Sequence, residues 1–462
     1  MNTIIQEVMR KIIKDNNKNL ESLFVDTREI SQYITDTKAM LDEIGVILVK
    51  QVLEMADVMI KDSAIRKRNW SAERANDPKT LTTIFGDVKY VRRYYKHSKS
   101  GDYSHLSDES LGIETDDRMD LFFESELINK ASEISYQKSG QSVSDKVSVS
   151  DQTVMNSIRR LEKIENNSVE IKRPKKKIKI LYIEADEDHV SMQDGSNQEI
   201  KLVYVHEGKE LVSKGRYELQ NCRYFSGSYR DSEELWLEVA EYLEEAYEMD
   251  NIEKIYLSGD GANWIKEGLN WIVNSRHVLD YYHLSKYVKK ATAHMSYTEP
   301  ILWGYIDRLD KQSVKDLFKI IIDQTETETK KNAVRDSRRY VLNNWESIER
   351  RYEKEYIGCS AEGHVSHILS ARLSSRPLGW CTLGADQMAR LRAFKANGGN
   401  VYDFMLKKKK ANRKEERIIA LDKRVVKKKL NDSAQECLDN ITILNKGKRT
   451  WAWEFLNSIR GA

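Results

Sequence analysis

Three acidic residues that are far apart in the sequence lie beside expected secondary-structure elements. Two of them follow expected strands, and the third lies at the start of an expected helix. Asp186 comes directly after an apolar strand expected over 178–185, and Asp260 follows a second strand expected over 252–258. Glu362 lies in the first turn of an expected helix. Because the C-terminal ends of neighbouring strands open onto ligand clefts, we expect the three carboxylates to share one site. Carboxylate oxygens are ligands that Mg²⁺ prefers, and a pair of such ions catalyses the cleavage and transfer of phosphodiesters.

Each of these acids also has a simpler explanation. An aspartate after a strand often caps a helix or lies in a solvated turn. Asp188 is the main alternative to Asp186, because alternation along the strand places both on the same face. Glu184 and Glu187 are weaker alternatives. The metal-site hypothesis therefore depends on the three acids together. Their order along the chain and the strand or helix beside each of them all fit one shared site.

The composition is that of a soluble protein with room for a sizeable core. The chain has 462 residues, of which 32% are charged, and its mean hydropathy is −0.65. We find no apolar run of membrane-spanning length and expect no secretory signal. The four cysteines, at positions 222, 359, 381 and 437, form no C-x-x-C pair, which argues against zinc modules and a disulfide framework. The sequence therefore predicts a cytoplasmic protein with no membrane partner.

The periodicity of apolar residues predicts an α/β protein that is α-rich overall. Over 178–293 the expected order is three strands, helix, strand, helix, strand and helix, which matches a ribonuclease-H-like mixed sheet. A helical insertion is expected to interrupt this core. The expected segments are a mostly helical DNA-binding region (1–170), the first part of the core (171–294), the insertion (295–357), the end of the core with the glutamate helix (358–385) and a basic helical C-terminal region (386–462).

Individual elements follow from the same patterns. In the N-terminal region, Thr82–Tyr95 alternates as a β-hairpin would, with Gly86-Asp87 as its turn. In the core, strands are expected over 178–185, 189–193, 200–206, 252–258 and 277–279, with 216–225 as an extension of the sheet, and helices over 232–249, 263–273 and 281–293.

Two N-terminal helices could form a helix-turn-helix that reads DNA. Helices are expected over 136–146 and 150–162, with a short turn between them. An ordinary helical hairpin explains the same pattern equally well. The side chains expected to reach DNA in the first interpretation are Gln152, Asn156, Arg159 and Arg160.

Two basic blocks suggest contacts with the DNA backbone, although the formal net charge is only +3. The first lies in an expected linker and contains Lys175, Lys176 and Lys177. The second, over 407–429, begins with Lys407, Lys408, Lys409 and Lys410. Three acidic residues interrupt the second block, so a solvated helical face is the alternative explanation.

Three segments resemble the DDE-type transposases of bacterial insertion sequences, and the ISLre-type group, which is related to Mutator-like elements, is the most similar. They are Tyr182–Val190, Gly259–Ile265 and Val278–Leu284. The resemblance extends over nearly the whole chain. It implies a ribonuclease-H-like core split by a helical insertion before the glutamate, and DNA cleavage and strand transfer at the ends of the element. It also implies two Mg²⁺ ions, which Mn²⁺ could replace, and a homodimer or higher oligomer on double-stranded DNA in the bacterial nucleoid.

The resemblance assigns roles by position. It places the catalytic, metal-binding acids at Asp186, Asp260 and Glu362. It also places the Asp-x-x-His element of the family at Asp280 and His283. These last two are either a buried polar pair that steadies a helix or, through His283, a contact to the scissile phosphate or a metal-bound water.

Two other functions fit the same sequence. A nuclease of the same superfamily would cut DNA without strand transfer, and an assay for joined products would distinguish it. A DNA-binding protein descended from a transposase would need no catalysis, and loss of an acid would favour it.

Overall fold

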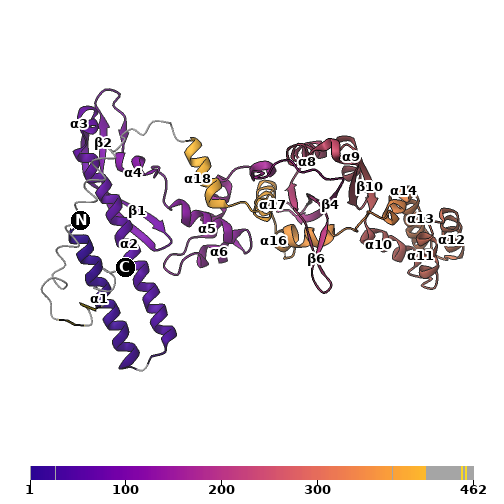
Figure 1. Cartoon of the computed structure of the whole chain (residues 1–462), viewed down its shortest axis with the longest axis horizontal. Helices are drawn as coiled ribbons and strands as arrows, with labels where there is room; N and C mark the ends of the chain where they lie inside the picture. The colour runs from indigo at the N-terminus through magenta and orange to yellow at the C-terminus, as the bar shows by residue number, and fades with distance from the viewer. Residues whose placement is uncertain (1, 27, 377, 413–448, 451–452, 455–462) are drawn as a thin grey trace. The chain divides into compact units, whose positions relative to one another are not determined.

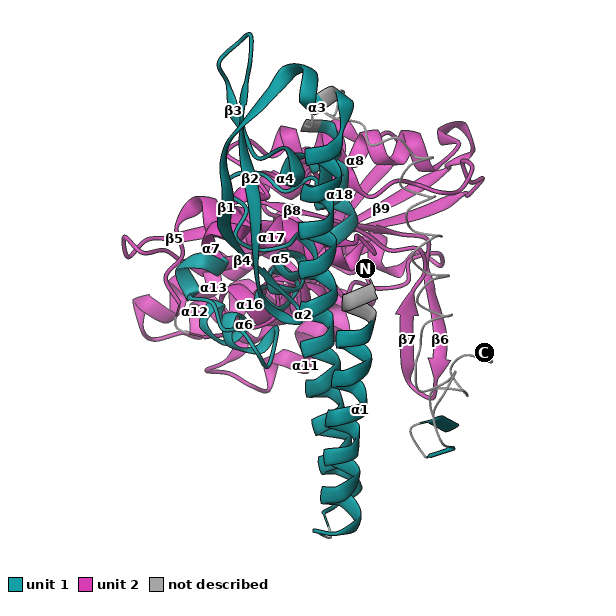
Figure 2. Cartoon of the chain, turned by 90° about the vertical axis from the view of Figure 1, so that its left-hand side faces the viewer, with its two compact units in different colours: residues 1–131, 135–154, 402–462 teal, residues 132–134, 155–401 magenta. Residues whose placement is uncertain are grey.

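This computed structural model describes residues 2–26, 28–376, 378–412, 449–450 and 453–454. The chain divides into two compact units, coloured separately in Figure 2. The first unit takes in residues 1–131, 135–154 and 402–462, and the second takes in residues 132–134 and 155–401.

The first unit is built on a long helical hairpin and a β-hairpin. Helices α1 and α2 run side by side (Figure 1), and α2 also packs against β2. The elements of this unit are α1 (Asn2–Phe24), α2 (Ile30–Asp62), α3 (Ala64–Asn69), β1 (Trp70–Thr83), β2 (Gly86–His97), β3 (Tyr103–Ser104), α4 (Leu106–Leu111), α5 (Leu121–Ala131) and α6 (Tyr136–Ser142), and most of α18 (Val401–Asn412) belongs to it. Helix α7 (Asp151–Arg160) begins in the first unit and ends in the second.

The β-hairpin of this unit differs from the expected one in its turn. Thr83 pairs with Gly86, so the turn residues are Ile84 and Phe85, and Gly86 already belongs to β2. A Cβ at Gly45 of α2 would lie 2.5 Å from the Phe85 ring. The missing side chain of Gly45 therefore makes room for Phe85, and this packing against α2, which lies far away in sequence, holds the turn in place.

The second unit contains a mixed sheet of five strands. Its order is β10-β9-β4-β5-β8, in which β4, β5 and β8 are antiparallel neighbours while β9 and β10 run parallel to β4. The strands are β4 (Ile180–Ser191), β5 (Asn197–His206), β8 (Arg223–Gly227), β9 (Lys254–Gly259) and β10 (Ser275–Leu279), and a separate two-stranded ribbon consists of β6 (Lys209–Ser213) and β7 (Arg216–Leu219).

The two faces of this sheet differ in character. Leu181, Ile183 and Ala185 of β4 pack in a large apolar cluster with α8 (Ser232–Ala246) and α9 (Asn263–Trp271). The alternate residues of β4 on the opposite face are also buried, although three of them carry charge: Glu184, Asp186 and Asp188. Burying carboxylates is costly unless they are paired or bind a cation, so this face is the candidate site.

Strand β4 is longer than the sequence suggested. The expected strand over 178–185 ended before the first acid, and 189–193 was expected as a separate strand. The structure instead has one continuous strand, because β5 pairs with it from Tyr182 to Ser191. Asp186 therefore lies within β4, and only the pairing with the parallel strand β9 ends before it.

A group of helices follows β10 and has its own apolar core. It comprises α10 (Tyr281–Thr292), which the sequence assigned to the sheet domain, and the helices of the expected insertion: α11 (Thr298–Asp307), α12 (Lys311–Gln324), α13 (Glu328–Asn343) and α14 (Trp345–Glu349). The chain then forms α15 (Ala361–Val365), a π-helical turn (Ser366–Ser370), α16 (Ala371–Leu373) and α17 (Thr382–Ala396). Short 3-10 turns lie at Asn166–Ser168, Met249–Asn251 and Arg350–Tyr352.

The expected boundary at residue 386 falls inside α17. This helix packs against β8, and it buries Gln387 and Arg390 along with its apolar residues, so it belongs with the sheet. The part of the second basic block beyond residue 412 lies outside the described residues.

The protein is thus a mixed α/β protein. In the described part of the chain, every helix is either too short or too polar to cross a bilayer.

His277 of β10 is expected to make stability depend on pH. Its side chain is buried, its Nδ1 lies 2.7 Å from Ser347 Oγ, and its Nε2 has no hydrogen-bond partner among the residues that the structure describes. Burial lowers the pKa of His277 to about 3, with the positive charges of Lys266 and Arg350 acting in the same direction. In the unfolded chain, histidine binds a proton at about pH 6.5. The free energy of unfolding therefore falls as the pH drops below that value.

Replacing His277 with glutamine is expected to flatten this fall by up to about 1.4 kcal/mol per pH unit in the acid range. Urea unfolding of the two proteins across a pH series measures the difference. Parallel curves for the two proteins would contradict a neutral, buried His277.

Candidate functional site

Asp186 and Asp260 lie at the same edge of the sheet. In the register of the parallel strands β4 and β9, Glu184 pairs with Ser258, and each aspartate follows this pair by two residues. Asp260 comes directly after β9, and its Oδ1 accepts a 2.7 Å hydrogen bond from the backbone N–H of Ala262. The structure therefore brings two acids that are far apart in sequence to neighbouring positions.

Asp186 is buried and close to Glu362. Burial raises the pKa of Asp186 to about 7; the negative charge of Glu362 adds to the rise, while a hydrogen bond from the backbone N–H of Glu187 and the charge of His283 oppose it. Glu362 itself is exposed, in the first turn of α15. The carboxylate of Asp186 is therefore poorly neutralised by the protein, and a bound cation would stabilise its charged form.

Asp188 has a different environment. Its two carboxylate oxygens accept hydrogen bonds of 2.8 and 2.9 Å from the Ser374 hydroxyl. Burial raises the pKa of Asp188, and the hydrogen bonds from Ser374 and Ser370 oppose this. Asp188 is thus bonded to serine hydroxyls, whereas Asp186 feels the negative charge of Glu362, and the choice between them as a metal ligand stays a prediction.

Asp280 and His283 form a polar pair at the same edge. The backbone N–H of Asp280 donates to the carbonyl of Gly259 at the end of β9, and its carboxylate caps α10 and lies 3.1 Å from His283 Nδ1. Burial lowers the pKa of His283, but the hydrogen bond to Asp280 and the charges of Asp186 and Asp260 outweigh it, so the pKa is raised. The negative charges of Asp186 and Asp260 therefore both act on His283.

A buried network beneath the site fixes the start of the Glu362 helix. Glu184 Oε1 lies 3.0 Å from His206 Nε2, and Glu184 Oε2 accepts hydrogen bonds from the backbone N–H of Ser360 (2.5 Å) and from the Tyr204 hydroxyl. Burial alone would raise the pKa of Glu184, but the His206 partner and these hydrogen bonds hold it below its usual value. The sequence had suggested Glu184 only as a weak alternative ligand, although alternation from Asp186 places it on the buried face.

The helical insertion also contributes to the site, which the sequence did not reveal. The hydroxyl of Tyr340, from α13, donates to the backbone carbonyl of Asp260, and the Tyr340 ring stacks on Tyr287 with 3.7 Å between centroids. A Cβ at Gly261 would lie 2.9 Å from Asn344 Oδ1, and Gly261 has φ +86°. Only glycine fits this close approach of the insertion to the end of β9.

The carboxylates do not form a preassembled metal cluster. Within the described ranges, no set of three or more His, Cys, Asp or Glu side chains is arranged to hold a metal ion. The oxygen donors Asp186, Asp260 and Glu362 nevertheless fit the chemistry that Mg²⁺ requires. The raised pKa of Asp186 is consistent with an uncompensated negative charge at this point.

The residues predicted to bind DNA in the first basic block and in α7 lie on the surface. Gln152, Asn156, Arg159 and Arg160 are all exposed. Lys175 is exposed as well, while Lys176 Nζ lies 2.5 Å from Glu207 Oε2 and Lys177 Nζ lies 3.5 Å from Glu248 Oε2. DNA would have to compete with these ion pairs, and contact there stays a prediction.

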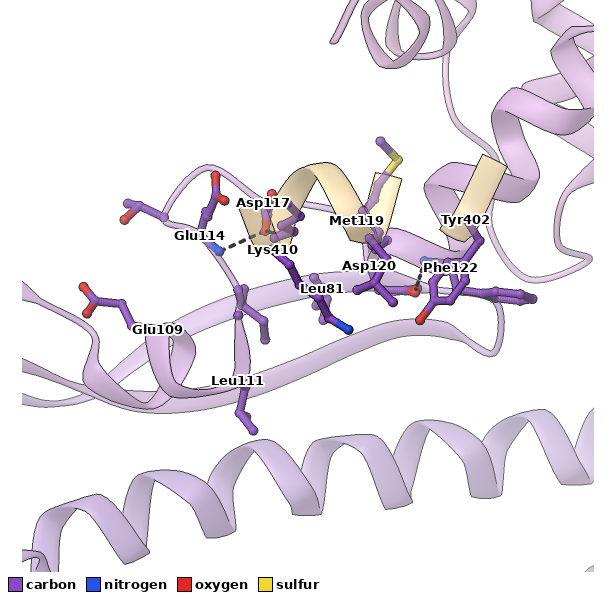
Figure 3. Close-up of a pocket in the computed structure, with 16 residues that line it drawn as sticks. Leu81, Glu109, Leu111, Glu114, Asp117, Met119, Asp120, Phe122, Tyr402 and Lys410 are labelled. Atoms are coloured by element: carbon purple, nitrogen blue, oxygen red, sulfur yellow. Dashed lines mark hydrogen bonds and ion pairs between the residues drawn. The ribbon is translucent and has the colours of Figure 1, made fainter. Parts of the chain in front are cut away.

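Two lysines of the second basic block, at the end of α18, line a pocket of the first unit. Figure 3 shows this pocket, whose volume is about 680 Å³ and which Lys409 and Lys410 line together with apolar and acidic side chains. Lys409 Nζ lies 2.6 Å from Asp117 Oδ2. Lys407 and Lys408 also have interaction partners. Contact of these four lysines with DNA stays a prediction.

The fold and the site define a mixed α/β protein with an acidic site at the C-terminal edge of its parallel strands. The chain belongs to UPF0236, described as an uncharacterised protein family, whose model matches residues 23–410.

Curated relatives are similar along nearly their whole length. A UPF0236 protein of Caldanaerobacter subterraneus subsp. tengcongensis is 41% identical over 444 residues, which cover 96% of this chain and 94% of the relative. A second from the same organism is 41% identical over 435 residues, covering 94% of this chain and 92% of the relative. The names of these two proteins combine eleven and four locus designations, respectively.

Proposed function

We propose that this protein is a DDE-type transposase that cleaves DNA at the ends of an insertion sequence and joins the freed ends to target DNA. The observation that carries the proposal is that register brings Asp186 and Asp260 to the same edge of the sheet, while α15, which carries Glu362, packs against β4 and Glu362 acts electrostatically on Asp186. Three carboxylates from two strands and a helix are a suitable donor set for divalent ions that act on phosphodiesters.

The topology supports a ribonuclease-H-like core. Three antiparallel strands (β4, β5 and β8) are followed by two strands (β9 and β10) that add in parallel on the other side of β4, with helices α8 and α9 in the connections. The helical insertion then separates β10 from α15, which carries Glu362. This order matches the one that the resemblance to DDE transposases implies.

The names of the relatives provide independent support. One name joins eleven locus designations within one organism, and a second joins four. A protein encoded at many loci of one genome is what an element that copies or moves itself would produce. Because this chain belongs to the same family as these relatives, we extend the same origin to it.

In this proposal Asp186, Asp260 and Glu362 would hold Mg²⁺, or Mn²⁺ in its place, which would supply an activated nucleophile and charge stabilisation for the leaving oxygen. Asp280 orients His283, whose raised pKa favours its positively charged form. That charge would offset the negative charge of a DNA phosphate at the edge of the sheet. Glu184, through Ser360, keeps the start of the Glu362 helix against β4.

The test uses the purified full-length chain and a supercoiled plasmid carrying its gene with the flanking DNA. With Mg²⁺, cleavage at the element boundaries and joined products are expected, and EDTA should abolish both. Cleavage without joined products would favour a nuclease. No cleavage with either Mg²⁺ or Mn²⁺, with DNA binding intact, would favour a non-catalytic DNA-binding protein.

Asp186→Asn is expected to reduce cleavage about a hundredfold or more, and Asp188→Asn only a few-fold. The first change removes a charge that faces Glu362 and His283, whereas the second affects a carboxylate already bonded to Ser374. Initial cleavage rates of the two variants on the same plasmid measure the difference. Equal losses, or a reversed order, would show that Asp188 is the ligand.

A further inference from the structure

The long helix α2 exposes a stripe of apolar side chains. Its members are between 48% and 62% exposed, and they are Ile30, Ile34, Leu41, Leu48 and Val52. A helix turns by about 100° per residue and rises about 1.5 Å, so the stripe stays within about 40° of arc along roughly 33 Å. The exposed face of a surface helix is normally polar, and a continuous apolar stripe of this length indicates a contact surface.

The stripe is not part of the core of the first unit. The buried side of α2 consists of other residues, among them Ile44, Leu53 and Ile60. These face α1 and the β-hairpin: Leu53 packs with Leu81 and Val88, and Ile60 lies in a cluster with the first residue of β1. The stripe therefore lies between the side of α2 that packs against α1 and the side that packs against the β-hairpin, and the described residues leave it exposed.

The spacing of the stripe points to a second copy of the same helix. The intervals are four, seven, seven and four residues, so the pattern is symmetric about Leu41. In an antiparallel pair centred on Leu41, Ile34 would meet Leu48 of the partner copy, and Ile30 would meet Val52 of the partner copy. The seven-residue intervals also match the repeat of a coiled coil, which keeps such a stripe facing its partner.

The charge beside the stripe fits this pairing. Lys38 lies about 60° from the axis of the stripe, and its Nζ is 3.0 Å from Asp42 Oδ2 and 2.9 Å from Asp145 Oδ2. The cation is thus neutralised within its own chain, so pairing of two helices would bury no unpaired charge.

We propose that the α2 stripe binds the α2 stripe of a second copy of this chain, antiparallel, with a two-fold axis at Leu41. Such a contact is self-complementary, because whenever one residue of the first copy meets another residue of the second copy, the reverse pair also meets across the axis. The inference does not depend on the catalytic role of the acids, since all of its residues lie in the first unit.

The first experiment measures the mass of the full-length protein by light scattering and analytical ultracentrifugation over a concentration series. The wild type is expected to be dimeric, and Leu41→Glu is expected to weaken dimerisation at least about a hundredfold, because two carboxylates would meet at the axis. The matched control is Val58→Glu, which changes a residue of α2 that is 48% exposed but lies about 100° from the axis of the stripe. Circular dichroism and thermal unfolding check that both variants fold.

Charge exchange then tests the orientation. Leu41→Glu and Leu41→Lys should each be monomeric alone and form a heterodimer when mixed. The double variant Ile34→Glu/Leu48→Lys should dimerise with itself, because opposite charges meet only in the antiparallel arrangement. A monomeric wild type, a dimer that survives Leu41→Glu, or a double variant that stays monomeric would overturn the proposal.

Discussion

Replacing Asp260 with asparagine is expected to lower Mg²⁺-dependent DNA cleavage by about a thousandfold or more, while folding and DNA binding are retained. The asparagine oxygen can still accept the hydrogen bond from the Ala262 N–H that shapes the turn after β9. The change removes a negative charge from a proposed metal site and from the surroundings of His283. Cleavage rates and DNA-binding anisotropy with the same DNA measure the two effects separately.

The matched control is Asp250→Asn, which alters an exposed aspartate in the short turn before β9. Its cleavage rate should equal that of the wild type. Near-normal cleavage by the Asp260→Asn protein would remove the basis for the proposed function.

Replacing Glu184 with alanine is expected to lower the free energy of unfolding by about 3–5 kcal/mol, the second large effect. Glu184 is 2% exposed, and its removal leaves His206, the Tyr204 hydroxyl and the backbone N–H of Ser360 without their common acceptor. Buried donors that lose a partner are costly because water cannot reach them. Urea unfolding measures the loss.

Two further variants make this result specific. Glu184→Gln retains an acceptor oxygen but not the charge, so a smaller loss is expected than for alanine. Glu244→Ala changes an exposed glutamate of α8 and should alter stability by less than about 0.5 kcal/mol. If Glu184→Ala were as mild as Glu244→Ala, the network would not anchor the Glu362 helix.

The pattern of apolar residues predicted most of the second unit because its elements are short and strongly periodic. The strand expected over 252–258 is β9 (Lys254–Gly259), and the helix expected over 263–273 is α9 (Asn263–Trp271). These elements lie next to glycines and turn residues that end them locally, so neighbouring sequence alone sets their limits.

Elements whose limits depend on partners far away in sequence could not be predicted in the same way. Strand β4 continues through Asp186 to Ser191 because β5 pairs with it, although acidic residues rarely favour a strand. The hairpin turn falls at Ile84–Phe85, where Phe85 packs over Gly45, and not at the Gly86-Asp87 pair that local turn statistics favour.

The sequence by itself determined the α/β class and the carboxylates that could form a site, because strand periodicity and the residues at strand ends are local properties of the chain. Only the tertiary structure decided which of these acids face one another. Register placed Asp186 beside the end of β9, Ser374 engaged Asp188, and Glu184 fixed the start of the Glu362 helix. These outcomes depend on contacts between residues separated by about 70 to 190 positions, and no local pattern encodes such contacts.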